Sequence, residues 1–259
     1  MIEVRPIPAF DDNYIWLLTR PGWPGCAVVD PGDEDPVIEA LAAAGLRLDT
    51  ILVTHKHGDH VGGIRGLKAR WPDARVYGPA GEPIATLEER LHGGDRVELS
   101  GLELTFEVLD VPGHTEGHIA YHGEGMLFCG DTLFAGGCGR VFSGTFGQLS
   151  DSLIRIGELP AQTRVYCAHE YTLANLGFAA WVEPGSAALA ERTAAARATR
   201  ARGEPTVPST VELELATNPF MRTDRPDVIT AASNWAGRPL DSRAEVFRAL
   251  RTWKDRDYD

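Results

Sequence analysis

The spacing of hydrophobic and polar residues changes along the chain and predicts where strands and helices form. Alternation with a period of two at 102–108 is typical of a half-buried strand, whereas the largely apolar run at 50–53 is typical of a strand buried on both faces. A helix is predicted at 35–44, where Asp35 can cap the first turn and Gly45 can end the last. Shorter strands are expected at 4–8, 14–18, 27–29, 75–77 and 96–99, and a further helix at 64–71.

Three more predicted strands are each followed by a residue that can bind metal. The strands 109–111, 126–129 and 165–168 precede His114, Asp131 and His169, respectively. Such residues at repeated strand ends indicate one site along one edge of a layered sheet structure, with loops that carry the chemistry. This part of the chain therefore predicts an α/β fold.

The last third of the chain has a different character. Helices are predicted at 173–181, 186–202 and 242–254. In the last of them, apolar residues recur at helical spacing, and a break with glycine and proline precedes it at 203–208. We therefore expect a domain boundary near residue 172, with a layered α/β domain at 1–172 and a small α-helical domain at 173–259.

Composition limits the possible partners. Of the 259 residues, 43% are hydrophobic and 24% charged, which is ordinary for a globular protein. The formal net charge of −12 argues against a nucleic acid or an anionic membrane as partner. We also see neither a signal peptide nor an apolar run near the roughly 20 residues that span a bilayer. An anionic substrate would need a local group of basic residues.

The four cysteines are widely spaced and form no CxxC pair. They are Cys26, Cys129, Cys138 and Cys167. This pattern favours a reducing, cytoplasmic location over a disulfide framework. Although three of them lie near candidate metal ligands in the sequence, better ligands are at hand, so we expect buried and inert thiols.

Three histidines and an aspartate fall within six positions, directly after the apolar run. They are His55, His57, Asp59 and His60. Imidazole and carboxylate are ligands that zinc and its first-row neighbours prefer. His55 and His57 can point to one side as an alternating pair, whereas Asp59 and His60 follow on the next turn and can reach a second point. The segment therefore predicts two metals rather than one.

The complete ligand set supports two metals that share one carboxylate, because it exceeds what one tetrahedral metal accepts. We assign His55, His57 and His114 to the first metal, and Asp59, His60 and His169 to the second. Asp131 is the best candidate for the shared bridge, since a carboxylate offers two oxygens.

Two metals about 3.5–4 Å apart can hold a hydroxide between them at neutral pH. The site thus predicts hydrolysis of an electrophilic carbonyl or phosphoryl group, with Asp59 and Asp131 as the catalytic carboxylates that act with this bridging hydroxide. We expect Asp30, in an Asp-Pro-Gly turn, to orient the metal-binding loop through hydrogen bonds rather than to bind metal. His118 is expected to pack beside the site.

The segment 55–60 resembles the HxHxDH signature of the metallo-β-lactamase superfamily, and His114, Asp131 and His169 follow in that superfamily's order. The resemblance implies a four-layer αββα sandwich with the metals along one edge. The signature is less specific for the reaction than for the fold, because the superfamily includes several classes of hydrolase and some oxidoreductases.

Other motifs narrow the resemblance to glyoxalase II, the hydroxyacylglutathione hydrolases. They lie at 10–14, 137–142, 168–172 with Asn175, and 217–222. The resemblance runs from about residue 2 to 254 and includes the helical C-terminal extension. It implies hydrolysis of S-D-lactoylglutathione to glutathione and D-lactate, with the domain at 1–172 catalytic and that at 173–259 binding substrate.

The resemblance also implies the substrate contacts. They correspond to Arg140, Phe142, Tyr171, Arg251 and Lys254. Phe142 stands where some members have tyrosine, so a hydroxyl contact is absent there. Arg251 and Lys254 correspond to the residues that receive the glycine carboxylate of glutathione, and their spacing of three places them on one helix face.

Several alternatives remain open at this point. Another hydrolase of the superfamily, a lactonase or phosphodiesterase, would share the ligands, and an iron-dependent persulfide dioxygenase would share the glutathione-type substrate. A metal-binding protein without catalysis is a further alternative. Zinc is the expected metal, with iron and manganese as alternatives. The sequence leaves open the thiol carrier, the acyl range and the oligomeric state.

Overall fold

The computed structural model describes residues 1–258, so Asp259, the last residue of the predicted helical domain, lies outside the described residues. The chain divides into two compact units. The first contains residues 1–110 and 115–130, and the second contains 111–114 and the chain from 131 onward. The predicted domain boundary near residue 172 stays a prediction.

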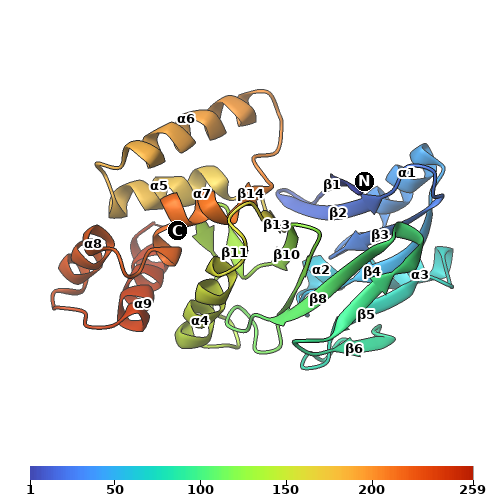
Figure 1. Ribbon diagram of the computed structural model, residues 1–259, viewed down its shortest axis with the longest axis horizontal. Helices are drawn as coiled ribbons and strands as arrows, with labels where there is room; N and C mark the ends of the chain where they lie inside the picture. Colours follow the sequence, from blue (N-terminus) through green and yellow to red (C-terminus); the bar gives the residue numbers. More distant parts are fainter. Residues whose placement is uncertain (259) are drawn as a thin grey trace. The chain divides into compact units, whose positions relative to one another are not determined.

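The first unit contains a mixed sheet whose strands lie side by side in chain order (Figure 1). They are β1 (Glu3–Ala9), β2 (Asn13–Thr19), β3 (Gly25–Val29), β4 (Arg47–Leu52), β5 (Arg75–Pro79) and β6 (Glu89–Leu91). The pairs β1–β2 and β2–β3 are antiparallel, and the pairs from β3 to β6 are parallel. Parallel neighbours need a crossover connection, which helices supply after β3 and after β4. These helices are α1 (Asp35–Ala44), α2 (Gly58–Val61) and α3 (Ile64–Arg70).

Helices α1 and α3 cover one face of this sheet. Val37 and Leu41 of α1 are fully buried and share one core cluster with Ile64 and Leu67 of α3 and with apolar residues of β1 to β5. Every residue of β2 is buried, so the other face of the sheet is covered as well. Burial on both faces explains why this part of the sequence reads as nearly continuous apolar runs.

The limits of α1 follow largely from its end signals. Its N-cap residue is Glu34, with Pro36 in the first turn, and Gly45 ends the helix in the left-handed conformation at φ 66°. The Asp33 side chain, rather than that of Asp35, accepts a hydrogen bond from a first-turn N–H (3.0 Å). The prediction that Asp35 caps the helix was therefore wrong, while the predicted helix and its end at Gly45 are confirmed.

An antiparallel meander forms the second sheet of the first unit. Within this unit its strands are β7 (Arg96–Leu99), β8 (Leu104–Asp110), β9 (Ile119–Gly123) and β10 (Met126–Gly130). The Phe106 ring meets the rings of Tyr121 and Phe128 edge-on between these strands. The buried Tyr121 hydroxyl donates to the Val53 carbonyl just after β4 (2.8 Å), so β9 packs against the first sheet.

The second unit is mostly helical. It contains β11 (Leu133–Phe134), β12 (Gly137–Cys138), α4 (Phe146–Gly157), β13 (Arg164–Cys167), α5 (Thr172–Val182), α6 (Ala187–Ala201), β14 (Ser209–Thr210), α7 (Val211–Thr217), α8 (Pro226–Ala236) and α9 (Arg243–Trp253) (Figure 1). The Phe178 ring of α5 contacts the rings of Phe220 and Trp253, and Phe220 also meets Phe247 of α9. These aromatic contacts form the core of the helical part. In residues 1–258 we find no helix with the length and apolar character needed to cross a membrane.

Candidate functional site

The first unit presents the predicted ligands of the HxHxDH segment as two pairs. The segment leaves β4 in an extended conformation that carries His55 and His57, and Asp59 and His60 lie in the short helix α2. His55 Nε2 lies 3.1 Å from His57 Nδ1, and His60 Nε2 lies 3.3 Å from Asp59 Oδ2. The change from extended chain to helix therefore presents these four side chains as two separate pairs.

Asp30 fixes the orientation of this segment. It accepts hydrogen bonds from the Thr54 N–H at Oδ1 and from the Thr54 hydroxyl at Oδ2, both at 2.8 Å. Its Oδ2 also lies 3.1 Å from His60 Nδ1, and Thr54 Oγ1 lies 3.1 Å from His55 Nδ1. The Thr54 hydroxyl donates its proton to Asp30 and can accept one from His55 Nδ1, and the Asp30 carboxylate favours a proton on His60 Nδ1. In both rings this favours Nε2 as the atom left for a metal, which is the usual arrangement of ligating imidazoles. The predicted orienting role of Asp30 agrees with these contacts.

Two further contacts at this segment were missed from the sequence. The Asn13 side-chain amide donates to Asp59 Oδ2 (3.0 Å) across a separation of 46 positions, which no local pattern reveals. The Asp-Pro-Gly turn lies so close to Asp59 that a Cβ on Gly32 would stand 1.9 Å from the Asp59 carbonyl oxygen. Glycine is therefore required at position 32. The motif at 10–14 was a signal for Asn13, although not for its partner.

The second unit brings the remaining predicted ligands together around Asp131. Its Oδ2 lies 3.5 Å from His114 Nε2, and its Oδ1 lies 3.4 Å from His169 Nε2. Each carboxylate oxygen thus faces a different histidine. This is the arrangement that a bridging carboxylate needs.

The geometry of both groups fits metal binding. His114 Nδ1 lies 2.8 Å from the Arg140 carbonyl oxygen, so the Nδ1 proton is held there and Nε2 is left for a metal. Ligands 2.0–2.1 Å from a tetrahedral ion are about 3.3–3.4 Å apart. The pairs of candidate ligand atoms within each unit lie 3.1–3.5 Å apart. The donor types, their spacing and the tautomers therefore suit zinc or a similar ion.

Two of the predicted substrate contacts lie directly on candidate ligands. The Tyr171 ring stacks on the His169 ring, with centroids 4.7 Å apart and planes 7° apart. The Phe142 ring meets the His114 ring edge-on at 5.2 Å and is 66% exposed. The structure therefore places both aromatic residues next to candidate ligand histidines of the second unit.

The three predicted basic contacts also lie in the second unit. Arg251 is buried and donates to the Cys138 carbonyl (3.0 Å) and to Asp255 Oδ1 (2.8 and 3.2 Å). Arg140 Nε lies 3.6 Å from the same Asp255 oxygen. Lys254 is also largely buried and has its Nζ 5.9 Å from the centre of the Tyr258 ring. A carboxylate therefore already lies between Arg140 and Arg251.

The thiols and His118 behave as the sequence predicted. All four cysteines are buried, and burial raises the pKa of Cys26 and Cys167 to about 12 and that of Cys138 to about 11. Thiols with such pKa values stay protonated at neutral pH and are poor nucleophiles. His118 is buried and stacks on His55, with centroids 4.5 Å apart.

Comparison with known proteins accounts for nearly the whole chain. The family model of the metallo-beta-lactamase superfamily matches residues 11–169, and that of the hydroxyacylglutathione hydrolase C-terminus matches residues 170–257. A hydroxyacylglutathione hydrolase from Alkalilimnicola ehrlichii is 55% identical over 98% of this chain and 99% of the relative.

Solved structures show the same fold. ETHE1 from Myxococcus xanthus aligns with 96% of this chain and 89% of its own, at a TM-score of 0.66 and 24% identity, which shows the fold alone. The structure of TTHA1623 in a di-iron-bound form aligns with 64% of this chain and 92% of its own, at a TM-score of 0.53 and 31% identity. The predicted metallo-β-lactamase fold is confirmed.

Family and ligand chemistry agree on the kind of site. The histidines and aspartates, within the metallo-β-lactamase fold, indicate a binuclear metal centre. The C-terminal helical part has a family model of its own, so the similarity is not limited to the metal-binding part. Because similarity of this extent covers both parts of the sequence, the chain belongs to the metallo-β-lactamase superfamily and, within it, to the hydroxyacylglutathione hydrolases, or glyoxalase II.

Proposed function

We propose that this chain hydrolyses S-D-lactoylglutathione to glutathione and D-lactate. The observation that carries the proposal is the 55% identity, over 98% of the chain, to a protein named hydroxyacylglutathione hydrolase. The match of the C-terminal part to the same family supports it, since this part carries the predicted carboxylate-binding residues Arg251 and Lys254. Both findings favour thioester hydrolysis over the lactonase, phosphodiesterase and persulfide dioxygenase alternatives.

Two metal ions are proposed to share the seven predicted ligands. The first ion would be bound by His55, His57 and His114, and the second by Asp59, His60 and His169, with Asp131 shared. Support comes from the pairing of ligand atoms in the first unit and from the two oxygens of Asp131, which face different histidines. Asp59, held by Asn13, and Asp131 are the proposed catalytic carboxylates.

Zinc remains the expected metal because imidazole and carboxylate ligands suit it, while the di-iron form of TTHA1623 keeps iron as an alternative. When bound, the two ions supply an activated water at neutral pH and a Lewis acid for the carbonyl. The departing thiol has an ordinary pKa of roughly 8.5, so the reaction needs no dedicated general acid.

The side chains of the second unit are proposed to hold the substrate. Tyr171 and the exposed Phe142 ring lie against ligand histidines, so a molecule that contacts them has its thioester close to the metals. Arg140 and Arg251 both contact the Asp255 carboxylate, so a negatively charged group is already bound between them. This supports the proposal that a substrate carboxylate binds in the same region. Positioning of this kind raises the rate without extra chemical groups.

The proposed division of labour follows the sequence prediction. Residues 1–172 would form the catalytic domain and 173–259 the substrate-binding domain, and the change of family model between residues 169 and 170 supports that division. The proposed location is the cytoplasm, which agrees with the burial of all four cysteines. The proposed partners are small glutathione thioesters and not nucleic acids.

The test is a steady-state assay on a panel of acyl thioesters of glutathione and of other small thiols, with metal content measured on the same sample. We expect close to two metals per chain and the highest kcat/KM for S-D-lactoylglutathione. Thioester turnover that is absent in a sample with two bound metals would contradict the proposed reaction. A higher kcat/KM for a thioester of another thiol would contradict only the proposal that glutathione is the thiol carrier.

A further inference from the structure

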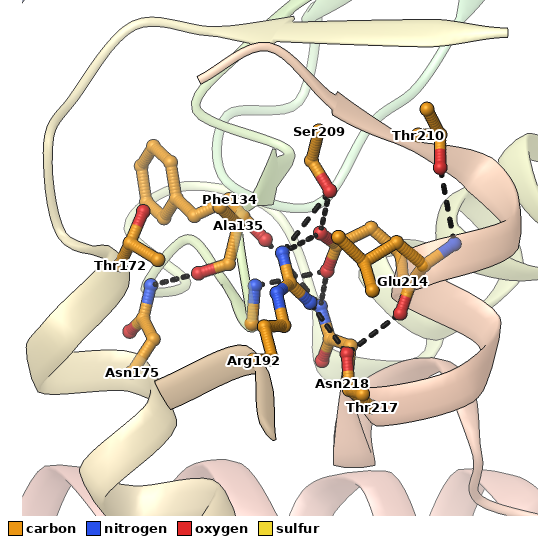
Figure 2. A network of polar contacts seen from close by, with 12 residues as sticks. Phe134, Ala135, Thr172, Asn175, Arg192, Ser209, Thr210, Glu214, Thr217 and Asn218 are labelled. Atoms are coloured by element: carbon orange, nitrogen blue, oxygen red, sulfur yellow. Dashed lines mark hydrogen bonds and ion pairs between the residues drawn. The ribbon is translucent and has the colours of Figure 1, made fainter. Parts of the chain in front are cut away.

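Side chains of the C-terminal helices bind the β11–β12 hairpin at five consecutive residues. Figure 2 shows the centre of this network, around Glu214. The bonds run from Asn218 to the carbonyls of Phe134 and Gly137, from Asn175 to the Ala135 carbonyl, from the Gly136 N–H to Glu214, and from Arg251 to the Cys138 carbonyl. A hairpin of two-residue strands has too few internal bonds to fix itself, so its conformation depends on these side chains.

Glu214 is the centre of the network and is completely buried. Its Oε1 accepts from Arg192 and from the Ser209 hydroxyl, and its Oε2 accepts from the Gly136 N–H (2.9 Å) and the Asn218 amide (2.9 Å). All four neighbours are donors, so the carboxylate suits this place and a neutral amide would not. Arg192 supplies the opposite charge that a buried carboxylate requires.

Asn218 connects Glu214 to the hairpin. It is 0% exposed, and its amide group donates to Glu214 and to the Gly137 carbonyl, both at 2.9 Å, while its own oxygen accepts from the Phe220 N–H (3.0 Å). Asn218 belongs to the Thr-Asn-Pro-Phe motif of the sequence, which the proposed metal and substrate sites leave without a role. The network gives the motif a structural task.

The hairpin lies between two parts of the candidate site. Asp131 precedes it, and Arg140, whose carbonyl orients His114, follows it. Its base is held by a hydrogen bond from the Gly139 N–H to the Thr132 carbonyl (3.4 Å) and by one from the Thr132 hydroxyl to the Val111 carbonyl (3.2 Å). A shift of the hairpin would therefore displace both the Asp131 carboxylate and the group that sets His114.

We propose that Glu214 and Asn218, with Arg192 as charge partner, are positioning residues for the metal centre. They hold the hairpin so that the Asp131 oxygens and His114 Nε2 stay at ligand spacing. This inference rests on the proposed metal-binding function. It adds a specific role for the C-terminal helices, which would set the metal ligands as well as bind substrate.

The rival explanation is that the network only stabilises the helical part. The two roles predict different results for metal affinity. A merely stabilising network would lower the melting temperature of the metal-free protein and leave metal affinity unchanged. A positioning network lowers metal affinity as well, and loss of groups that orient ligands typically weakens it by about 10- to 100-fold.

The experiment compares Glu214→Gln and Asn218→Ala with the control Glu183→Gln. Glu183 is also a buried carboxylate, and both of its oxygens accept from an arginine, Arg222 (2.9 and 3.0 Å), rather than from the hairpin. Zinc affinity and stoichiometry are measured by competition with a chromophoric zinc chelator on the metal-free proteins. Their thermal unfolding is measured in parallel.

We expect roughly 10- to 100-fold weaker zinc binding in Glu214→Gln and Asn218→Ala and parental affinity in Glu183→Gln. Parental affinity in folded Glu214→Gln and Asn218→Ala would overturn the proposal. If neither variant unfolds cooperatively, Asn175→Ala replaces them, since it loses only the bond to the Ala135 carbonyl. It should then bind zinc several-fold more weakly, and unchanged affinity would overturn the proposal.

The outcome is separable from that of the proposed function. Zinc affinity is measured without substrate, so it stays informative if the chain prefers another thioester. A parent protein that fails to bind two zinc ions would instead contradict the binuclear centre itself.

Discussion

Replacing Asp30 with asparagine is expected to weaken the binding of the second metal, because it removes the carboxylate charge that lies beside His60 Nδ1. In the parent, Oδ1 accepts from the Thr54 N–H (2.8 Å), and Oδ2 lies 3.1 Å from His60 Nδ1. Asparagine keeps one acceptor oxygen and brings an NH2 donor. Because the backbone N–H can only donate, we expect the amide oxygen to face Thr54 and the NH2 group to face His60.

The size of the effect follows from burial. Asp30 is 4% exposed and His60 0% exposed, so water cannot take the place of the Asp30 carboxylate beside His60 Nδ1. Either two donors stay face to face, or the His60 proton moves from Nδ1 to Nε2, the atom assigned to the metal. A buried donor left without an acceptor costs about 1–3 kcal/mol. At about 1.4 kcal/mol for each tenfold change, metal affinity should fall roughly 5- to 150-fold.

The assay is zinc competition with a chelator, together with the number of ions bound per chain. The control is Asp33→Asn, the same chemical change three positions away, where one oxygen accepts the exposed Asp35 N–H (3.0 Å) and an amide oxygen can do the same. We expect Asp30→Asn to lose affinity for one of two ions and Asp33→Asn to keep both. Two ions bound by Asp30→Asn with parental affinity would refute the tautomer argument.

Three other experiments, two with variants and one with the parent protein, test further parts of the structure. Asp131→Asn should lose bound metal or nearly all turnover, since an amide has one acceptor oxygen, and full metal content with parental kcat would rule out the bridge. Arg251→Ala/Lys254→Ala should lower kcat/KM for S-D-lactoylglutathione roughly 10- to 100-fold, as lost charged hydrogen bonds are worth about 1.5–3 kcal/mol, and an unchanged kcat/KM would exclude this carrier site. Burial raises the pKa of Cys26 and Cys167 to about 12, so a thiol reagent should label them slowly until the protein is unfolded; rapid labelling of the folded protein would contradict their burial.

Strands were predictable where burial leaves a clear pattern. The apolar runs and the alternation at 102–108 located most strands of the first unit, with limits that differ by a few residues. The predicted strands at 102–108 and 109–111 are parts of one strand, β8, which begins only at Leu104. The turn residues just before Leu104 form a 3-10 helix, and such a local turn is not visible in the hydrophobic pattern. Strand β9 was missed because it is short and begins directly after the polar segment 114–118.

Helices that are apolar or rich in alanine were predicted from the sequence. Helices whose composition gives a weaker helix signal were missed. Helices α5, α6 and α9 are confirmed, whereas α4, α7 and α8 were not predicted. Helix α4 contains glycine and serine, which lower helix propensity, yet the capping box of Thr145 and Gln148 was a usable signal. Helix α8 has proline in its first turn and Gly237 after its end, the same signals that located α1.

The identities of the candidate ligands were predictable because chemistry limits which residues bind metals. The groups that orient them were not, apart from Asp30, because each pairing joins distant positions. Asn13 and Asp59 are 46 positions apart, and Glu214 and Gly136 are 78 apart. Such pairs are set by the fold as a whole, and one sequence contains no periodicity that reveals them.

The contacts of the hairpin also set an order of events during synthesis. The side chains that bind residues 134–138 come 40 to 113 positions later in the chain, and the last of them belongs to Arg251 in α9. Synthesis begins at the N-terminus, so the HxHxDH segment can fold long before these partners have been made. The Asp131 loop is therefore among the last parts to reach its final conformation. We expect a nascent chain to complete its metal centre only when its final helix has been made.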